Sequence, residues 1–279
     1  MSELVVSEAD AGDFTHGRLA WDVLHAVATP TGRYTSVDLR QCVHLCPYTL
    51  ACLAAISLRE RRSLELILPF DSACSNHVKR IGLPGFFSGY SGETFVKRST
   101  NVVLRQLDRA PGNFASEAMR VLTEQCDLSP GTLPRLQNHL DEVILNALTH
   151  SESPVGAFVG GQGFPTNRRV DVAILDLGVT IRGHLSRNPR YGSFTNDAQA
   201  IIAATKEGVT GTVGLNKWNE PNSGAGLTEL REYAEQGHCE LAVLSGGGLV
   251  VFGADHQPND LGFRGRFPGC LVNVRFHMS

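Results

Sequence analysis

The sequence predicts an α/β protein made of two consecutive units. Its 279 residues are enough for two modest domains with real cores, and 42% of them are hydrophobic. Helical and extended hydrophobic patterns alternate along the chain, which is typical of mixed α/β folds. Glycine, serine and tyrosine cluster between residues 85 and 100. We therefore place the first domain at residues 1–97 and the second at residues 98–279.

The first domain is predicted to contain a strand, a helix, a strand and a helix in turn, at residues 37–39, 48–61, 64–68 and 71–81. Pro69 ends the second strand. Asp71 is a suitable N-cap for the last helix, and Gly82 is a suitable end for it. This order of elements indicates a small α/β domain.

The chain from Val37 to Leu53 reads Val-Asp-Leu-Arg-Gln-Cys-Val-His-Leu-Cys-Pro-Tyr-Thr-Leu-Ala-Cys-Leu. This segment is similar to the core of a STAS domain, the fold of anti-anti-sigma factors. In that family a phosphorylatable serine and a glycine stand at the start of the helix, where this chain has Cys46, Pro47 and Thr49. The resemblance implies a STAS-like scaffold that lacks the regulated serine and serves as a docking or sensing module.

Cysteines in the same segment raise the question of a metal. If Cys42, His44 and Cys46 lay on a strand, their spacing of two would place all three on one face, as zinc ligands require. No second pair of ligands has a metal-like spacing, so buried cysteines are the more common interpretation. The seven cysteines are odd in number and irregularly spread, which suits free thiols in a reducing cytoplasm.

The second domain begins with an amphipathic helix, predicted over residues 132–151 from apolar residues spaced by three and four. Glu142, Asn146 and His150 are each four residues apart and form a polar line on one face. Such a line can position a water with the carboxylate, hold a divalent ion through the amide oxygen and offer an imidazole to a phosphate. The alternative is an ordinary solvated helix face.

A strand predicted over residues 169–175 ends in Asp176-Leu-Gly178. An acid at a strand end, beside a glycine that lets a ligand approach the backbone, can accept a hydrogen bond from an exocyclic amine such as that of adenine. The alternative is a simple Asp-Gly turn.

A glycine-rich turn, Gly224-Ala-Gly226-Leu227, precedes a helix predicted over residues 228–236. Glycines at a helix start expose backbone N–H groups and the positive end of the helix dipole, which together can bind phosphate. A Gly-x-Gly pair is also common in linkers.

Taken together, these three motifs resemble the GHKL nucleotide-binding fold of gyrase-type ATPases, histidine kinases and anti-sigma-factor kinases. The resemblance implies a two-layer α/β sandwich with a mixed sheet, completed by strands near residues 239–244, 248–252 and 271–276. It implies ATP and Mg²⁺ as cofactors, with Glu142 as the catalytic base and Asn146 as the magnesium ligand. Asp176 and Gly178 match the adenine-reading motif, and Gly224 and Gly226 match the pair that closes over the phosphates. Two positions depart from the family, because Thr180 and Cys270 stand where it usually has glycine and threonine.

Residues 179–223 correspond to the mobile lid of that family. They include a short helical pattern at residues 198–206 and a run rich in glycine and threonine. Lys206 and Lys217 are candidates to reach the β- or γ-phosphate, and solvated surface lysines are the alternative.

The sequence therefore predicts an ATP-binding regulatory protein. We expect a protein kinase of the anti-sigma type or a slow ATPase, and a non-catalytic ATP-gated switch or scaffold is the alternative. A regulatory protein partner is expected, and a homodimer is left open. A net charge of −3 gives no general attraction for nucleic acid, and no apolar run approaches the ~20 residues of a membrane span.

Overall fold

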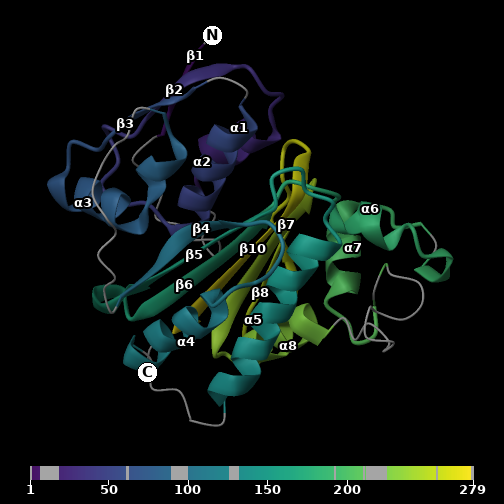
Figure 1. Cartoon of the computed structure of the whole chain (residues 1–279). Coiled ribbons are helices and arrows are strands. Elements are labelled where there is room, and N and C mark those ends of the chain that lie inside the picture. Colours follow the sequence, from purple (N-terminus) through teal and green to yellow (C-terminus); the bar gives the residue numbers. More distant parts are fainter. Residues whose placement is uncertain are drawn as a thin grey trace.

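The computed structural model describes residues 2–6, 19–60, 63–88, 100–125, 132–191, 193–209, 211, 225–255 and 257–277. Within these residues the chain forms a small parallel sheet and a large antiparallel sheet, with helices between them and on the far side of the large sheet (Figure 1). The predicted mixture of helices and strands is confirmed.

The small sheet contains three parallel strands in sequence order, β1 (Ser2–Val5), β2 (Tyr34–Asp38) and β3 (Glu65–Ile67). The helices of this part are α1 (Trp21–Ala28), α2 (Pro47–Arg59), α3 (Ser72–Ile81) and the 3-10 turn η1 (Leu83–Phe86). As predicted, Asp71 caps α3, its carboxylate accepting from the Cys74 N–H at 2.7 Å, and Gly82 ends that helix in a left-handed conformation.

Helix α2 is apolar on all sides because it lies between the two sheets. All of its residues from Pro47 to Ser57 are buried. It packs against α1 and also against β5 (Ala157–Phe164) and β6 (Arg169–Asp176) of the large sheet. A helix that is hydrophobic all round is expected in such a buried place. The helix therefore joins the two parts of the molecule through shared packing.

The large sheet has seven strands, in the spatial order β4 (Asn101–Leu107), β5, β6, β10 (Phe267–His277), β7 (Cys239–Gly246), β8 (Gly248–Phe252) and β9 (Asn259–Asp260). Every neighbouring pair is antiparallel, so the predicted mixed sheet is wrong. The reason lies in the last strand. The chain returns from β6 to β7 in the same direction, but β10 inserts between these two strands and runs against both.

Helices α4 (Phe114–Gln125), α5 (Thr132–Thr149) and α8 (Ala225–Glu235) cover one face of the large sheet (Figure 1). One hydrophobic cluster fills the space between that face and these helices. The opposite face packs on α1 and α2 in a second cluster that also contains the core of the small sheet. One end of the large sheet carries α6 (Ile181–Leu185), the turn η3 (Pro189–Tyr191) and α7 (Asp197–Ala204). The turn η2 (Pro165–Asn167) joins β5 to β6.

The predicted helices and strands of the second domain lie close to their expected positions. The helix expected at 132–151 is α5, and the strand expected at 169–175 is β6. Helix α8 begins three residues before the predicted start, and β7, β8 and β10 correspond to the three later strands.

Candidate functional site

Asp176, at the end of β6, is the best-defined feature of the candidate site. Its exposed fraction is 3%. The Gly178 N–H donates to its Oδ1 at 2.9 Å, and the Cys270 main chain also donates to it. Burial raises the pKa of Asp176 to about 7, although both main-chain hydrogen bonds act to lower it. The fold thus holds an acid where its charged form is costly.

A second buried aspartate on the same strand provides a comparison. Asp171 is 1% exposed, and the Arg275 guanidinium donates to both of its oxygens, at 3.0 and 3.2 Å. Such an arginine neutralises the carboxylate within the fold. The groups that act on the pKa of Asp176 are burial and main-chain amides, with no cation among them. The two acids therefore differ in kind, and Asp176 is the one suited to an outside donor.

Two glycines allow the backbone to pass close to Asp176. A Cβ at Gly178 would overlap the carbonyl group of Ser151, at the end of α5. A Cβ at Gly269 would overlap the backbone and carboxylate oxygens of Asp176, and Gly269 has a φ of +70°. The close neighbour of Gly178 is the Ser151 backbone, just after the end of α5, so packing within the fold already requires glycine at this position.

Ser245, on β7, secures this turn from the other side. Its hydroxyl accepts from the Ile181 N–H at 3.0 Å and donates to the Gly269 carbonyl at 2.6 Å, and the residue is 1% exposed. The Val179 N–H donates to the Ser151 carbonyl at 2.5 Å. Hydrogen bonds from α5, β7 and the start of β10 thus hold the turn that carries Asp176.

Thr180 and Cys270, which the sequence comparison with the GHKL pattern singled out, have local explanations. Thr180 has a φ of −63°, which any residue adopts, and its hydroxyl caps α6 by accepting from the Gly183 N–H at 3.1 Å. Glycine is therefore not needed there. Cys270 lies opposite Asp176 in the β6–β10 pairing. Burial, and then the neighbouring Asp176 charge, raise the pKa of the Cys270 thiol well above its ordinary value, so it stays protonated.

Glu142, Asn146 and His150 lie half-buried along α5, at the border between its core stripe and its outer side. From Glu142 to His150 the line rises by eight residue steps, about 12 Å at 1.5 Å per residue. Glu142 lies next to the start of α8, where a Cβ on Gly226 would come within 3.1 Å of the Glu142 Cβ. The opposite end of α5 meets the turn of Asp176 through Ser151. The helix therefore joins two of the predicted motifs.

The motif around the start of α8 is described in part. Gly226 is buried against α5, and Leu227 is half-buried and packs on the hydrophobic cluster under the helices. Leu227 is thus a packing residue. Gly224 and Lys217 lie outside the described residues. Lys206 is exposed beyond the end of α7, next to Thr205, whose hydroxyl accepts from Arg231 of α8 at 3.3 Å.

His150 has a partner that the sequence did not indicate. Its ring lies 5.1 Å from the ring of His184, centroid to centroid. Burial lowers the pKa of His150, and burial, with His150 and Arg187 nearby, lowers the pKa of His184 to about 4. A Cβ on Gly211 would overlap the His184 ring and main chain. Two neutral imidazoles thus connect the end of α5 with α6.

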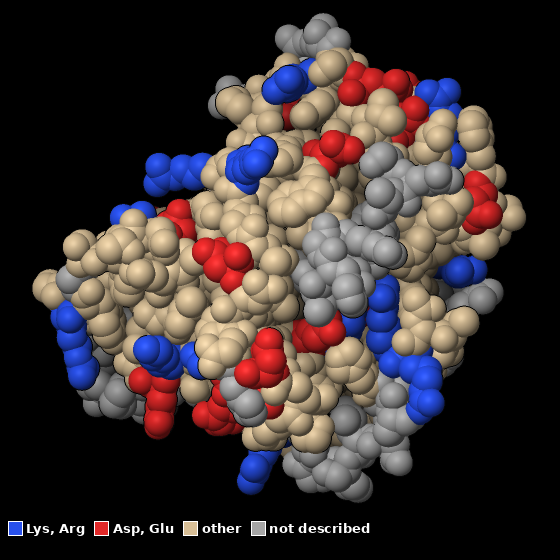
Figure 2. Space-filling model, turned by 180° about the vertical axis from the view of Figure 1, so that it is seen from behind, with Lys and Arg blue, Asp and Glu red and all other residues tan. Residues whose placement is uncertain are grey.

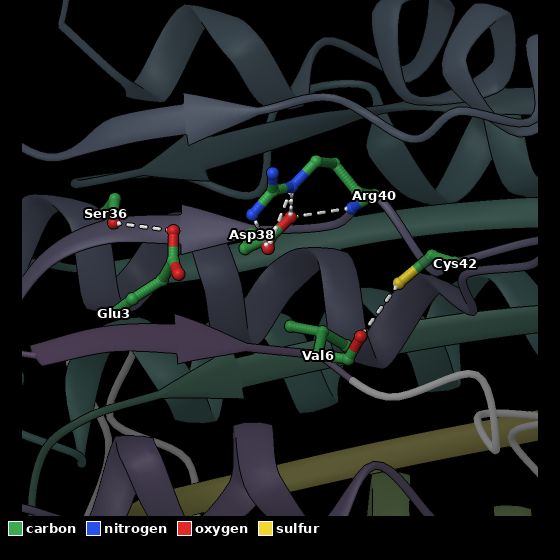
Figure 3. Close-up of polar contacts among 6 residues, drawn as sticks. All are labelled: Glu3, Val6, Ser36, Asp38, Arg40 and Cys42. Carbon is green, nitrogen blue, oxygen red and sulfur yellow. Dashed lines mark hydrogen bonds and ion pairs between the residues drawn. The ribbon is translucent and has the colours of Figure 1, made fainter.

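The proposed zinc ligands do not converge. Residues 42–46 form an irregular segment, not a strand, so the strand spacing that a zinc site would need is not present there. The Cys42 thiol points away to the Val6 carbonyl at 3.5 Å, beside an Asp38–Arg40 ion pair of 2.7 Å (Figure 3). Cys46 instead contacts the His44 Nε2 at 3.5 Å. Across the described part of the chain, no three His, Cys, Asp or Glu side chains are grouped to hold a metal.

The surface and the remaining sequence features give a consistent picture. Cationic and anionic side chains are interspersed over the face shown in Figure 2, as expected from a near-balanced charge. Of the helices that the structure describes, none combines the length and apolar composition needed to cross a bilayer. The six cysteines within the described ranges are free thiols.

Several residues of the site were not singled out from sequence. Ser245 opens a Ser-Gly-Gly-Gly run between two apolar strands, a pattern that signals a hairpin with close backbone approach. Ser151 and His184 carry no comparable signal, because their roles depend on tertiary contacts. No protein-family model, curated protein or solved structure matches this chain.

Proposed function

We propose that residues 100–277 form an adenine-nucleotide site in which Asp176 accepts a hydrogen bond from the purine amine. The observation that carries the proposal is a 3% exposed carboxylate whose pKa burial raises to about 7, held in a turn whose two glycines, Gly178 and Gly269, allow the backbone to pack closely around it. A buried acid without a neighbouring cation costs stability unless a ligand or a reaction uses it. An amine donor would favour its charged form.

The residues present fit Mg-ATP. Asp176 and the start of α8 lie at opposite ends of one face of α5, so a nucleotide bound along this helix would bring its phosphates to Gly226. The positive end of α8 favours phosphate there. Magnesium on a nucleotide takes few protein ligands, because phosphates and water supply the rest. We infer that the Asn146 amide oxygen would be one such ligand, and the metal would neutralise phosphate charge.

Glu142 is then the candidate base. It lies beside Gly226, at the phosphate end of the line. Its role would be to orient and deprotonate the attacking hydroxyl or water, and His150 is a further candidate phosphate contact. This assigns an anti-sigma-type protein kinase or a slow ATPase. An ATP-gated binding switch or scaffold is the second candidate, favoured by the core that the large sheet shares with the STAS-like part.

Replacing Glu142 separates enzyme from switch. We expect Glu142→Gln to keep Mg-ATP affinity and to lower turnover or phosphotransfer by at least ~100-fold, as the loss of a general base does. Glu232→Gln, an exposed change on α8, is the matched control and should behave as wild type. Radiolabelled γ-phosphate release, measured with and without a candidate protein substrate, provides the readout. Unchanged turnover in Glu142→Gln would remove Glu142 from catalysis, and absent turnover in every form would favour the switch.

A further inference from the structure

The lid helix α7 is attached to the large sheet by close packing and a hydrogen bond at the turn between β7 and β8. Gly246, Gly247 and Gly248, at the turn from β7 to β8, lie against the first turn of α7, and the Gly247 N–H donates to the Asp197 carboxylate at 2.8 Å. A Cβ on Gly246 would meet that carboxylate at 2.5 Å, and one on Gly248 would meet the Ala198 backbone nitrogen at 2.6 Å. Asp197 also lies 3.9 Å from Arg182 of α6. The turn therefore acts as a socket for the lid helix.

The same turn is bonded to the loop 261–266. The Phe263 N–H donates to the Gly247 carbonyl at 3.0 Å, and the Leu261 N–H donates to the Leu249 carbonyl at 2.8 Å. Gly247 thus accepts from the loop on one side and donates to Asp197 on the other. A shift of the loop would act directly on the residue that holds α7.

The side chain of Phe263 packs against α1, in the N-terminal part of the molecule. It is 7% exposed, and its ring stacks on His25 at 4.9 Å and on Trp21 at 6.2 Å, both from α1. Stacked aromatic pairs of this kind contribute beyond their buried area. The loop is therefore attached to α1 by its side chain and to the socket by its main chain.

Helix α1 is in turn bound to α2. The Tyr48 hydroxyl accepts from the Ala20 N–H at 2.9 Å at the start of α1. At its end, the Arg59 guanidinium donates to the Ala26 carbonyl at 3.0 Å and also to Val27. Because both ends are held, α1 moves with the STAS-like part.

We propose that the loop 261–266 transmits the position of the STAS-like part to the lid helix α7, through Phe263 and the Gly247–Asp197 hydrogen bond. This regulation rests on the proposed nucleotide site, because it assigns α7 to that site's lid. A signal or partner that moves α1 would pull on Phe263, loosen Asp197 and release α7 from the sheet. The contacts form one continuous chain of packing and hydrogen bonds, through which such coupling can travel.

Hydrogen exchange of the α7 amides in the nucleotide-free, full-length protein tests the coupling. We expect Phe263→Leu to speed exchange at residues 197–204 by at least ~5-fold, with His25→Leu giving the same change from the opposite side of the stack. Phe164→Leu is the matched control. Phe164 is 9% exposed and meets His44 of the STAS-like part at 5.0 Å, on β5, which β6 and β10 separate from the strands β7 and β8 that carry α7.

The double variant Phe263→Leu/Asp197→Ala should exchange no faster than Asp197→Ala, because both changes cut the same chain. The proposal is overturned if α7 exchange is unchanged in Phe263→Leu and His25→Leu, if Phe164→Leu accelerates it equally, or if the double variant is additive. Titration with Mg-ATP is the separate arm. Coupled exchange without nucleotide binding would refute the nucleotide site alone, whereas binding without coupled exchange would refute the coupling alone.

Discussion

At the residue scale, Asp176 and Asp171 are two buried acids on one strand that differ in how their charge is balanced. Asp171 is paired with Arg275 across the β6–β10 ladder, so its charge is balanced within the fold. The pKa of Asp176 is lowered by main-chain N–H groups and raised by burial. Burial has the larger effect, and the pKa is about 7. An unfavourable buried charge is a common property of functional sites.

This difference predicts an opposite response to substitution. The pKa of Asp176 is raised in the fold above its ordinary 3.8, so the stability linked to its protonation is present at low pH and is lost as pH rises through about 7. Asp176→Asn cannot ionise and escapes this loss. We expect the variant to gain on wild type as pH rises from 5 to 8, by about 2–4 kcal/mol at pH 8.

Denaturant unfolding at several pH values measures this gain. Asp171→Asn is the control, because it weakens a buried ion pair and should lose stability across the whole range. If the difference in unfolding free energy between Asp176→Asn and wild type did not change with pH, the pKa of Asp176 would not be raised in the fold.

At the element scale, the junction between α5 and the turn after β6 depends on glycine. A Cβ at Gly178 would overlap the Ser151 carbonyl group, whereas a Cβ at Gly253, beyond the end of β8, would meet nothing within 4 Å. We expect Gly178→Ala to lower the free energy of unfolding by more than ~2 kcal/mol and to weaken nucleotide binding, because the turn must move away from α5.

Gly253→Ala should leave both quantities near wild type. Urea denaturation and nucleotide titration of the two variants provide the comparison. Equal stability of Gly178→Ala and Gly253→Ala would mean that the turn does not need to lie so close to α5.

The sequence predicted these elements better than it predicted their connections. The apolar spacing of residues 132–151 predicted α5, and the β-branched apolar run of residues 169–175 predicted β6, whose two faces lie in the two hydrophobic clusters. The sequence did not indicate that β10 would insert between β6 and β7, since pairing order depends on long-range contacts. It favoured buried cysteines over a zinc site at Cys42 and Cys46, and both are buried in the fold. The line from Glu142 to His150 was visible, but the His184 ring that meets it was not.

At the scale of the whole molecule, the large sheet is covered on both faces, and one cover comes from the N-terminal part. Phe158, Leu175 and Leu271 face α1 and α2 in the same cluster as the core of the small sheet. A fragment of residues 98–279 would expose to water the apolar face of the sheet that packs on α1 and α2. Exposed apolar areas of this size drive association.

We therefore expect the fragment of residues 98–279 to aggregate, or to bind a hydrophobic dye several-fold more strongly than the full chain. Light scattering and dye fluorescence measure this directly. Co-expression with residues 1–97 should restore a compact, soluble complex if the shared core is the cause. A monomeric fragment with full-length stability would instead show that the two parts fold independently.

The packing of the N-terminal part against the large sheet would suit a regulatory role. A nucleotide site placed against the sheet end, with α7 held by the socket of three glycines, would be sensitive to movement of the part that packs on the opposite face. The N-terminal part could then report a partner or signal without touching the nucleotide.

The central claim is nucleotide binding at Asp176, and calorimetric titration of the full chain with ATP and Mg²⁺ tests it most directly. We expect micromolar binding by wild type that strengthens as pH rises from 6 to 8, because the charged carboxylate is the acceptor. Asp176→Asn should show no binding while remaining folded, and Asn146→Ala should lose the Mg²⁺ dependence that Asn138→Ala keeps. Absence of both heat and any change in melting temperature with wild type, or wild-type affinity in Asp176→Asn, would contradict the account.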